Sequence, residues 1–164
     1  MRFWGTAMLF TLTAALSVRA ADCTEPPAPA VDWQRCYLDG RNLQGQDLSR
    51  AHLVDASFER AILDKVNLGG ANAYHAKFIS SHMEQSKLDD GNFAEADFTK
   101  ADLSGASLKN ADLRRTRFFR ANLQGADLSG AKTLGADLLN ADLSGALWTD
   151  GKRVCAPGSV GQCN

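Results

Sequence analysis

The chain has 164 residues, 45% of them hydrophobic, and a formal net charge of −1 at pH 7. This length suits one domain, and the hydrophobic content is that of a globular chain rather than a disordered one. The near-neutral charge argues against a nucleic-acid partner, because binding to a phosphate backbone requires a clear excess of lysine and arginine.

Residues 1–20 have the composition of a secretory signal peptide. Arg2 gives a positive start, residues 3–16 are mostly apolar, and small residues precede a cleavage point after Ala20. The apolar run is too short for a membrane span, and no later segment is long and apolar enough for one. We therefore expect export to the periplasm or the medium, without membrane insertion. Cleavage leaves 18 − 2 = 16 basic against 19 acidic residues, a mature charge of about −3.

Residues 21–30 are a proline-rich lead-in, which we expect to cap the N-terminal end. From residue 31 to residue 150 the chain divides into 24 consecutive blocks of five. Each block has a small residue, then often Asp or Asn, then a large apolar central residue and two polar or turn-forming residues. The sequence Ala101-Asp102-Leu103-Ser104-Gly105 shows the plan. Such self-similarity predicts a repeat architecture.

A period of five excludes a helix and a flat strand. In a helix five residues advance by about 500°, so the central residues would wrap the whole circumference. In a strand the inward residues would be spaced alternately by two and three, which breaks strict alternation in every block. Each block must therefore be a short extended segment followed by a tight turn, with its central and first residues facing inward. Glycines at the last position of several blocks suit a turn with positive φ.

The number of blocks in one coil follows from the central phenylalanines. Aligning the sequence every twenty residues places Phe58, Phe78, Phe98 and Phe118 in one column, whereas a spacing of fifteen scatters them. Four blocks per coil gives about six coils and, at about 4.8 Å per stacked strand, a rod roughly 29 Å long.

These blocks resemble those of the pentapeptide-repeat proteins, over about 120 of the 164 residues. The resemblance implies an all-β fold, a right-handed quadrilateral β-helix in a single domain. Three positions depart from the pattern. Arg41 and Gln46 stand where small residues are expected in the first coil, and the small Ala73 occupies a central position. We expect Phe93, one coil later and preceded by Gly91, to fill the space beside Ala73.

The four cysteines lie at the two ends of the repeat, and an even count in an exported chain predicts disulfides. A link between the ends would have to cross roughly 29 Å, whereas the two Cα atoms of a disulfide lie within about 7 Å. We therefore expect Cys23 to pair with Cys36, and Cys155 with Cys163 in a C-terminal cap of residues 151–164. The first and last central residues, Trp33 and Trp148, are expected to plug the ends of the core.

No motif indicates catalysis or a cofactor. The sequence contains no nucleophile elbow, phosphate loop or zinc-protease motif. The three histidines, His52, His75 and His82, are not placed to form a metal site together. We therefore expect neither an enzyme nor a metal protein, and no cofactor.

The candidate interface is apolar and basic. Phe119, Leu134 and Leu139 directly follow a central position and so point outward, and Ile79 shares the column of Phe119 and Leu139. Exposed apolar surface often marks an interface; the alternative is that the tail after residue 149 folds over these side chains. The basic candidates are those without an acidic neighbour one coil away, Arg114 and Arg120, whereas Lys109, Arg115 and Arg117 align with Asp89, Glu95 and Asp97.

These features favour a non-catalytic exported binding or scaffold module that presents a rigid surface to a protein partner. Because a solenoid exposes its core and unpaired edges at its ends, a homodimer through the C-terminal end is an open alternative. The resemblance also implies a second function, that of a DNA-mimicking protein that binds DNA gyrase, which the signal peptide and the near-neutral charge disfavour. A hydrolase or a sugar-binding protein has no residue signature here.

Overall fold

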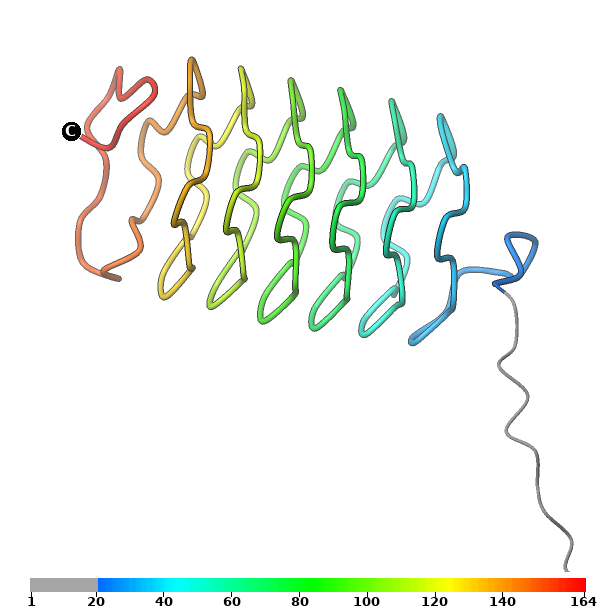
Figure 1. The fold of residues 1–164 in the computed structure, drawn as a ribbon. Coiled ribbons are helices and arrows are strands. Elements are labelled where there is room, and N and C mark those ends of the chain that lie inside the picture. Colours follow the sequence, from blue (N-terminus) through cyan, green and yellow to red (C-terminus); the bar gives the residue numbers. More distant parts are fainter. Residues whose placement is uncertain (1–20) are drawn as a thin grey trace, which may run out of the picture.

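The computed structural model describes residues 21–164, which form a rod of stacked coils (Figure 1). The predicted signal peptide lies outside these residues. The described part contains no helix and no extended strand; in residues 31–150 each block of five contributes a single bridge residue followed by a turn. None of it forms a helix long and apolar enough to cross a membrane.

Parallel β-bridges join each coil to the next. Every one of them links a residue to the residue twenty positions later, from Asp32 with His52 to Asp127 with Leu147. This spacing equals four blocks and is the spacing that the phenylalanine column predicts. At each bridge the central residue donates its N–H to the following coil, as from Leu38 to the Ser57 carbonyl at 2.7 Å. The bridge residue donates back, as from Ser57 to the Cys36 carbonyl at 2.8 Å.

The turn between two blocks closes through a backbone hydrogen bond. The first residue of a block donates to the central carbonyl of the block before, as from Cys36 to Trp33 at 3.1 Å. The third residue of each turn in residues 31–145 has a positive φ, which glycine adopts readily. The same position also holds larger residues, including Arg50 at 57° and Lys65 at 57°. Since an L-residue pays about 1 kcal/mol for this conformation, the hydrogen bonds around the turn must hold it there.

The Asp or Asn at the second position of a block also stabilises the turn. Its side-chain oxygen accepts the N–H of the residue two positions later, as at Asp102, which accepts from Ser104 at 3.0 Å. Asp and Asn are the residues whose short side chains make this contact well. The amide of Asn122 adds a link between coils, because its Nδ2 donates to Asp102 at 3.0 Å. The repeated polar residue is therefore a structural element of the turn.

The core is a stack of side chains along the axis of the rod. The rings of Phe58, Phe78, Phe98 and Phe118 follow one another with centroids 5.2, 4.8 and 5.3 Å apart and planes within 10°. Offset stacking of this kind adds stabilisation beyond the burial of apolar area.

Phe93 leaves its own column and reaches this stack. Its ring is tilted and its centroid lies 6.2 Å from that of Phe78, in the coil of Ala73, and 5.9 Å from that of Phe98. Gly91 provides the room, because a Cβ placed on it would clash with Cε2 of Phe93. The glycine and the phenylalanine are therefore coupled.

Gly91→Ala is expected to lower the free energy of unfolding by about 1 to 3 kcal/mol, through overpacking against Phe93. The equivalent positions one coil to either side hold alanine, so the repeat pattern alone would predict no loss. In a Phe93→Leu background the same substitution should cost much less. Urea unfolding of the four proteins of this double-mutant cycle, with disulfides intact, measures the coupling. An equal cost in both backgrounds would contradict it.

Two of the turn aspartates link stability to pH. The hydrogen bond from the Arg114 guanidinium lowers the pKa of Asp112, and that from the Ser144 hydroxyl lowers the pKa of Asp142. Because their pKa in the unfolded chain is about 3.9, their contribution is complete above that value and is lost as the pH falls through the lower folded values.

We expect the thermal midpoint to be nearly constant between about pH 7 and 5 and to fall below about pH 4. Asp142→Asn keeps an acceptor for the Ser144 N–H but does not titrate, so it should reduce the acid-induced fall. Circular dichroism melts across this range check the expectation. A midpoint that stayed level down to pH 2 would count against it.

Candidate interaction surface at the C-terminal end

The N-terminal end of the core is closed by side chains. A disulfide between Cys23 and Cys36 ties the lead-in to the first coil. Trp33 is 0% exposed, and the Arg41 guanidinium lies 5.7 Å from the centroid of its ring, a cation–π contact. The remaining central residues of the first coil are at most 1% exposed. Arg41 departs from the repeat because its side chain turns over the end of the rod.

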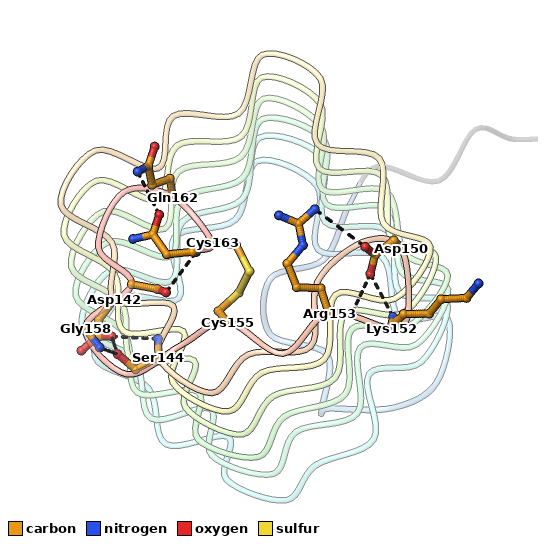
Figure 2. The surroundings of a disulfide bond; sticks show 11 residues. Asp142, Ser144, Asp150, Lys152, Arg153, Cys155, Gly158, Gln162 and Cys163 are labelled. Carbon is orange, nitrogen blue, oxygen red and sulfur yellow. Dashed lines mark hydrogen bonds and ion pairs between the residues drawn. A yellow bond between two sulfur atoms is a disulfide. The ribbon is translucent and has the colours of Figure 1, made fainter.

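The C-terminal cap, residues 151–164, turns back across the last coil (Figure 1). Val154 forms an antiparallel bridge with Leu147, and Val160 forms one with Asp142. The disulfide between Cys155 and Cys163 joins the two parts of the cap over the opening of the coil (Figure 2).

The cap satisfies the backbone of two blocks, 141–145 and 146–150. Leu143 donates its N–H to Ser159 at 2.8 Å, and Trp148 donates to Arg153 at 2.7 Å. Trp148 itself packs, partly buried, against the core beneath the cap. The last two blocks of the repeat are thus covered.

The two preceding blocks, residues 131–140, receive no such cover; we refer to them as the open half-coil. Four of its N–H groups have no hydrogen-bond acceptor within residues 21–164, namely those of Thr133, Gly135, Leu138 and Asn140. The Ala131 and Ala136 carbonyls likewise receive no donor from this part of the chain. The equivalent groups in the coil before are paired, as from Phe118 to Asp137 at 2.7 Å. Half of the last coil therefore lacks the hydrogen bonds that a following coil or the cap would provide.

Exposed apolar side chains gather at the same end. Six large hydrophobic residues are exposed in the described part of the chain, and four of them belong to the open half-coil or the cap. These four are Leu134 at 81%, Leu139 at 61%, Val154 at 62% and Val160 at 52%. The alternative in which the tail covers Leu134 and Leu139 is wrong, because the tail pairs with residues 141–150 instead. Phe119 and Ile79 are only partly exposed.

The basic candidates lie differently from the expectation. Arg114 forms an ion pair with Asp112 of the same block, with Nη2 2.6 Å from Oδ2. The sequence comparison between coils missed this pair because both residues lie on one turn. Arg120 has its guanidinium 5.1 Å from the centroid of the Phe119 ring. Neither arginine makes a recorded contact with the four exposed apolar residues named above.

Ion pairs between coils run along the sides of the rod. Arg115 contacts Glu95 at 3.4 Å and Arg117 contacts Asp97 at 2.7 Å, as the charge columns predict. The expected pair of Lys109 with Asp89 does not form. The Lys109 ammonium lies 3.2 Å from Asp127, because the Asp89 carboxylate accepts the Ser107 hydroxyl and the Lys109 N–H instead. Exposed pairs of this kind stabilise a protein by at most about 1 kcal/mol.

A polar groove of about 460 Å³ lies on one side, lined by His75, Lys77, Glu95, Ala96, Asp97, Arg115 and Arg117. Most of its charges are paired with one another. His75 sits with Nδ1 2.7 Å from Asp55 rather than beside another histidine. The described residues contain no group of three or more histidines, cysteines or carboxylates arranged to hold a metal ion.

The structure is a β-solenoid built from a five-residue unit, with four units in each coil. The family model for pentapeptide repeats in eight copies matches residues 34–70, 42–78, 76–115, 96–132 and 121–146. The chain belongs to the pentapeptide repeat family, whose members form right-handed β-helices.

Several solved structures of this family are similar to the chain. HetL of Nostoc sp. strain PCC 7120, a protein involved in regulating heterocyst differentiation, is 32% identical, with a TM-score of 0.67 over 75% of this chain and 62% of HetL. QnrB1, a plasmid-mediated fluoroquinolone resistance protein, is 22% identical, with a TM-score of 0.47 over 71% of this chain and 62% of QnrB1. A pentapeptide repeat protein of the Arabidopsis thaliana thylakoid lumen is 25% identical, with a TM-score of 0.30 over 75% of this chain and 83% of that protein.

This chain spans less than two thirds of the length of HetL and of QnrB1. No curated protein sequence matches it significantly.

Replacing Cys155 and Cys163 by alanine is expected to loosen the cap and lower stability by about 2 kcal/mol, since the short closed loop restricts the unfolded chain. Amide exchange should accelerate at Leu143 and Trp148, whose N–H groups are bound to the cap, and not at Leu63 in the second coil. The matched control replaces Cys23 and Cys36 and should affect the first coil instead. Hydrogen exchange read by NMR separates the two patterns; uniform acceleration in either variant would contradict a local effect.

Proposed function

We propose that the protein is a non-catalytic exported binding module, a quadrilateral rod of about six coils that docks a protein partner through its C-terminal end. The observation that supports this most strongly is the coincidence of unpaired backbone groups and exposed apolar side chains in the open half-coil. Either feature alone is common on protein surfaces, but together they form an edge that an extended segment of another chain fits.

The sides of the rod are less suited to docking. Lys109, Arg115 and Arg117 on these sides already form ion pairs with carboxylates of a neighbouring coil, which weakens their attraction for a charged partner. The same pairing is a reason not to propose the gyrase-binding function, since the acidic residues of this surface are interspersed with lysine and arginine. We therefore place the docking surface at the C-terminal end.

Export is the second part of the proposal. All four cysteines, which lie in the described residues, are in disulfides. Disulfides persist in oxidising compartments such as the periplasm or the exterior of the cell. Together with the composition of residues 1–20, this supports an exported protein whose mature chain begins at Ala21, which N-terminal sequencing of the exported protein checks.

Leu134→Ser combined with Leu139→Ser is expected to reduce binding to the C-terminal partner at least about tenfold, since the apolar anchors of an interface carry most of its affinity. Both side chains are exposed, so stability should change little. Tyr37→Ser is the matched control, because Tyr37 is 84% exposed in the first coil. Affinity capture from the exported fraction, with quantitative mass spectrometry, compares the three proteins. Equal capture by the leucine and tyrosine variants would contradict docking through this end.

A further inference from the structure

We propose that the open half-coil binds an extended segment of another protein, which runs parallel to it and carries an acidic residue followed five positions later by a basic one. This inference rests on the proposed docking end and describes the chemistry of what binds there. It follows from the path of the chain after Asp150, from the unpaired backbone groups and from the charges of Lys132 and Asp137.

A continued repeat would have covered the open half-coil. Because bridged residues are twenty positions apart, residues 151–160 would then lie above it. The chain turns away instead. The Asp150 carboxylate accepts the N–H groups of Lys152 and Arg153, each at 2.9 Å, and Gly151 adopts a φ of 66° (Figure 2). The uncovered position therefore has the length of two blocks.

The coil beneath shows how a segment of this length pairs. Residues 112–119 form six backbone hydrogen bonds with residues 91–100, which lie in the same columns as the open half-coil. The N–H groups of Asp112 and Arg117 donate at 2.9 Å, and four carbonyls of the segment accept at 2.7 to 3.0 Å. The open half-coil presents the same two acceptors and four donors, and none of them is paired within residues 21–164. Eight residues of a partner therefore satisfy all six groups.

The corner between the two blocks favours a parallel partner. A parallel segment can repeat the turn beneath it residue for residue, as every coil of the rod does. The antiparallel cap needs one residue more to pass its own corner. Its bridge residues Val154 and Val160 are six positions apart, whereas Leu147 and Asp142 opposite them are five apart. A spacing of five therefore belongs to the parallel direction.

The bridge positions of the open half-coil carry opposite charges. Lys132 and Asp137 are exposed, and neither is among the ion pairs of the described residues. The coil beneath has the reverse order, with Asp112 bridged to Lys132 and Arg117 bridged to Asp137. Opposite charges on neighbouring strands attract, and like charges repel. A partner that continues the alternation places an acidic residue above Lys132 and a basic one above Asp137.

The apolar side chains complete the pattern. The partner residue directly after each charged one lies above the partly buried Thr133 or Leu138, and the next one lies above the exposed Leu134 or Leu139. Apolar residues at these positions would cover the end of the core. The expected segment thus has an acidic residue and two apolar ones, two further positions, and then a basic residue and two apolar ones.

The probe is a synthetic peptide of residues 111–120 with blocked ends, which has Asp112 and Arg117 in the expected order. Its matched control carries Asp112→Arg and Arg117→Asp, so composition and net charge are unchanged. Each peptide is titrated by NMR into protein expressed from the full chain, with disulfides formed. We expect the first peptide to bind at least about fivefold more tightly than the control. It should slow amide exchange at Thr133 and Leu138.

Two further variants separate charge from backbone pairing. N-methylation of the peptide at Asp112 and Arg117 removes its two donors and is expected to weaken binding at least about fivefold. In the protein, Lys132→Gln combined with Asp137→Asn should abolish the preference between the two peptides. Both side chains are exposed, so this variant should fold, which a thermal melt verifies.

Equal affinity of the two peptides for the wild-type protein would overturn the charge pattern, and tighter binding of the control would overturn the parallel direction. Binding that N-methylation leaves unchanged would contradict backbone pairing. Slow amide exchange at Thr133 and Leu138 before any peptide is added would also overturn the inference, because a second copy of the chain would then already cover the open half-coil.

Failure of this inference is distinguishable from failure of the proposed function. If neither peptide binds while capture of a protein still depends on Leu134 and Leu139, the inferred segment is refuted and the proposed function stands. If the first peptide binds with the expected preference while capture is indifferent to the two leucines, the leucine-dependent docking is refuted and the inferred pairing stands.

Discussion

The backbone ladder between coils is the constraint on which this structure depends. Each central N–H must find a carbonyl in the next coil, so the chain must return to the same column after every twenty residues. Short blocks with tight turns achieve this return, and the small and central residues fill the narrow interior that results. The ladder determines where each coil stacks, and the buried side chains stabilise the backbone path that results.

The turns show how strongly the ladder acts. Sixteen residues other than glycine have a positive φ in the described chain, among them Arg35 and Glu95. At about 1 kcal/mol each, such conformations would be unfavourable in an isolated peptide. Here the N–H of the positive-φ residue donates to a carbonyl of the next coil, as from Arg35 to Val54 at 2.9 Å. In many turns the Asp or Asn side chain also accepts the N–H of the residue two positions later, which holds the turn in place. The strain is distributed along the rod and offset by the same hydrogen bonds in every coil.

The repeat could be predicted from the sequence because it is periodic. The column of Phe58 and Phe78 gave the twenty-residue coil, and the distance between the ends gave the disulfide pairing that the structure contains. The cap itself was predicted, but its path over the last coil and the Arg114 pair were not predictable in this way. Val154 and Val160 lie outside the period, and their antiparallel bridges depend on which edge the returning chain meets. Arg114 pairs with Asp112 in its own block, and comparing residues twenty positions apart does not detect a pair within one block.

The two ends differ because a ladder can be closed either by side chains or by backbone. At the first coil, Trp33 and Arg41 cover the core, whereas at the last coil a returning strand covers only half of it. Thr133, the one polar central residue of the repeat, lies in the uncovered half. A hydroxyl is tolerated there because it is partly exposed, and Leu134 beside it points outward because it follows a central position. Thr133 therefore stands where the ladder has no next coil, and the missing coil is the feature that distinguishes this end of the rod.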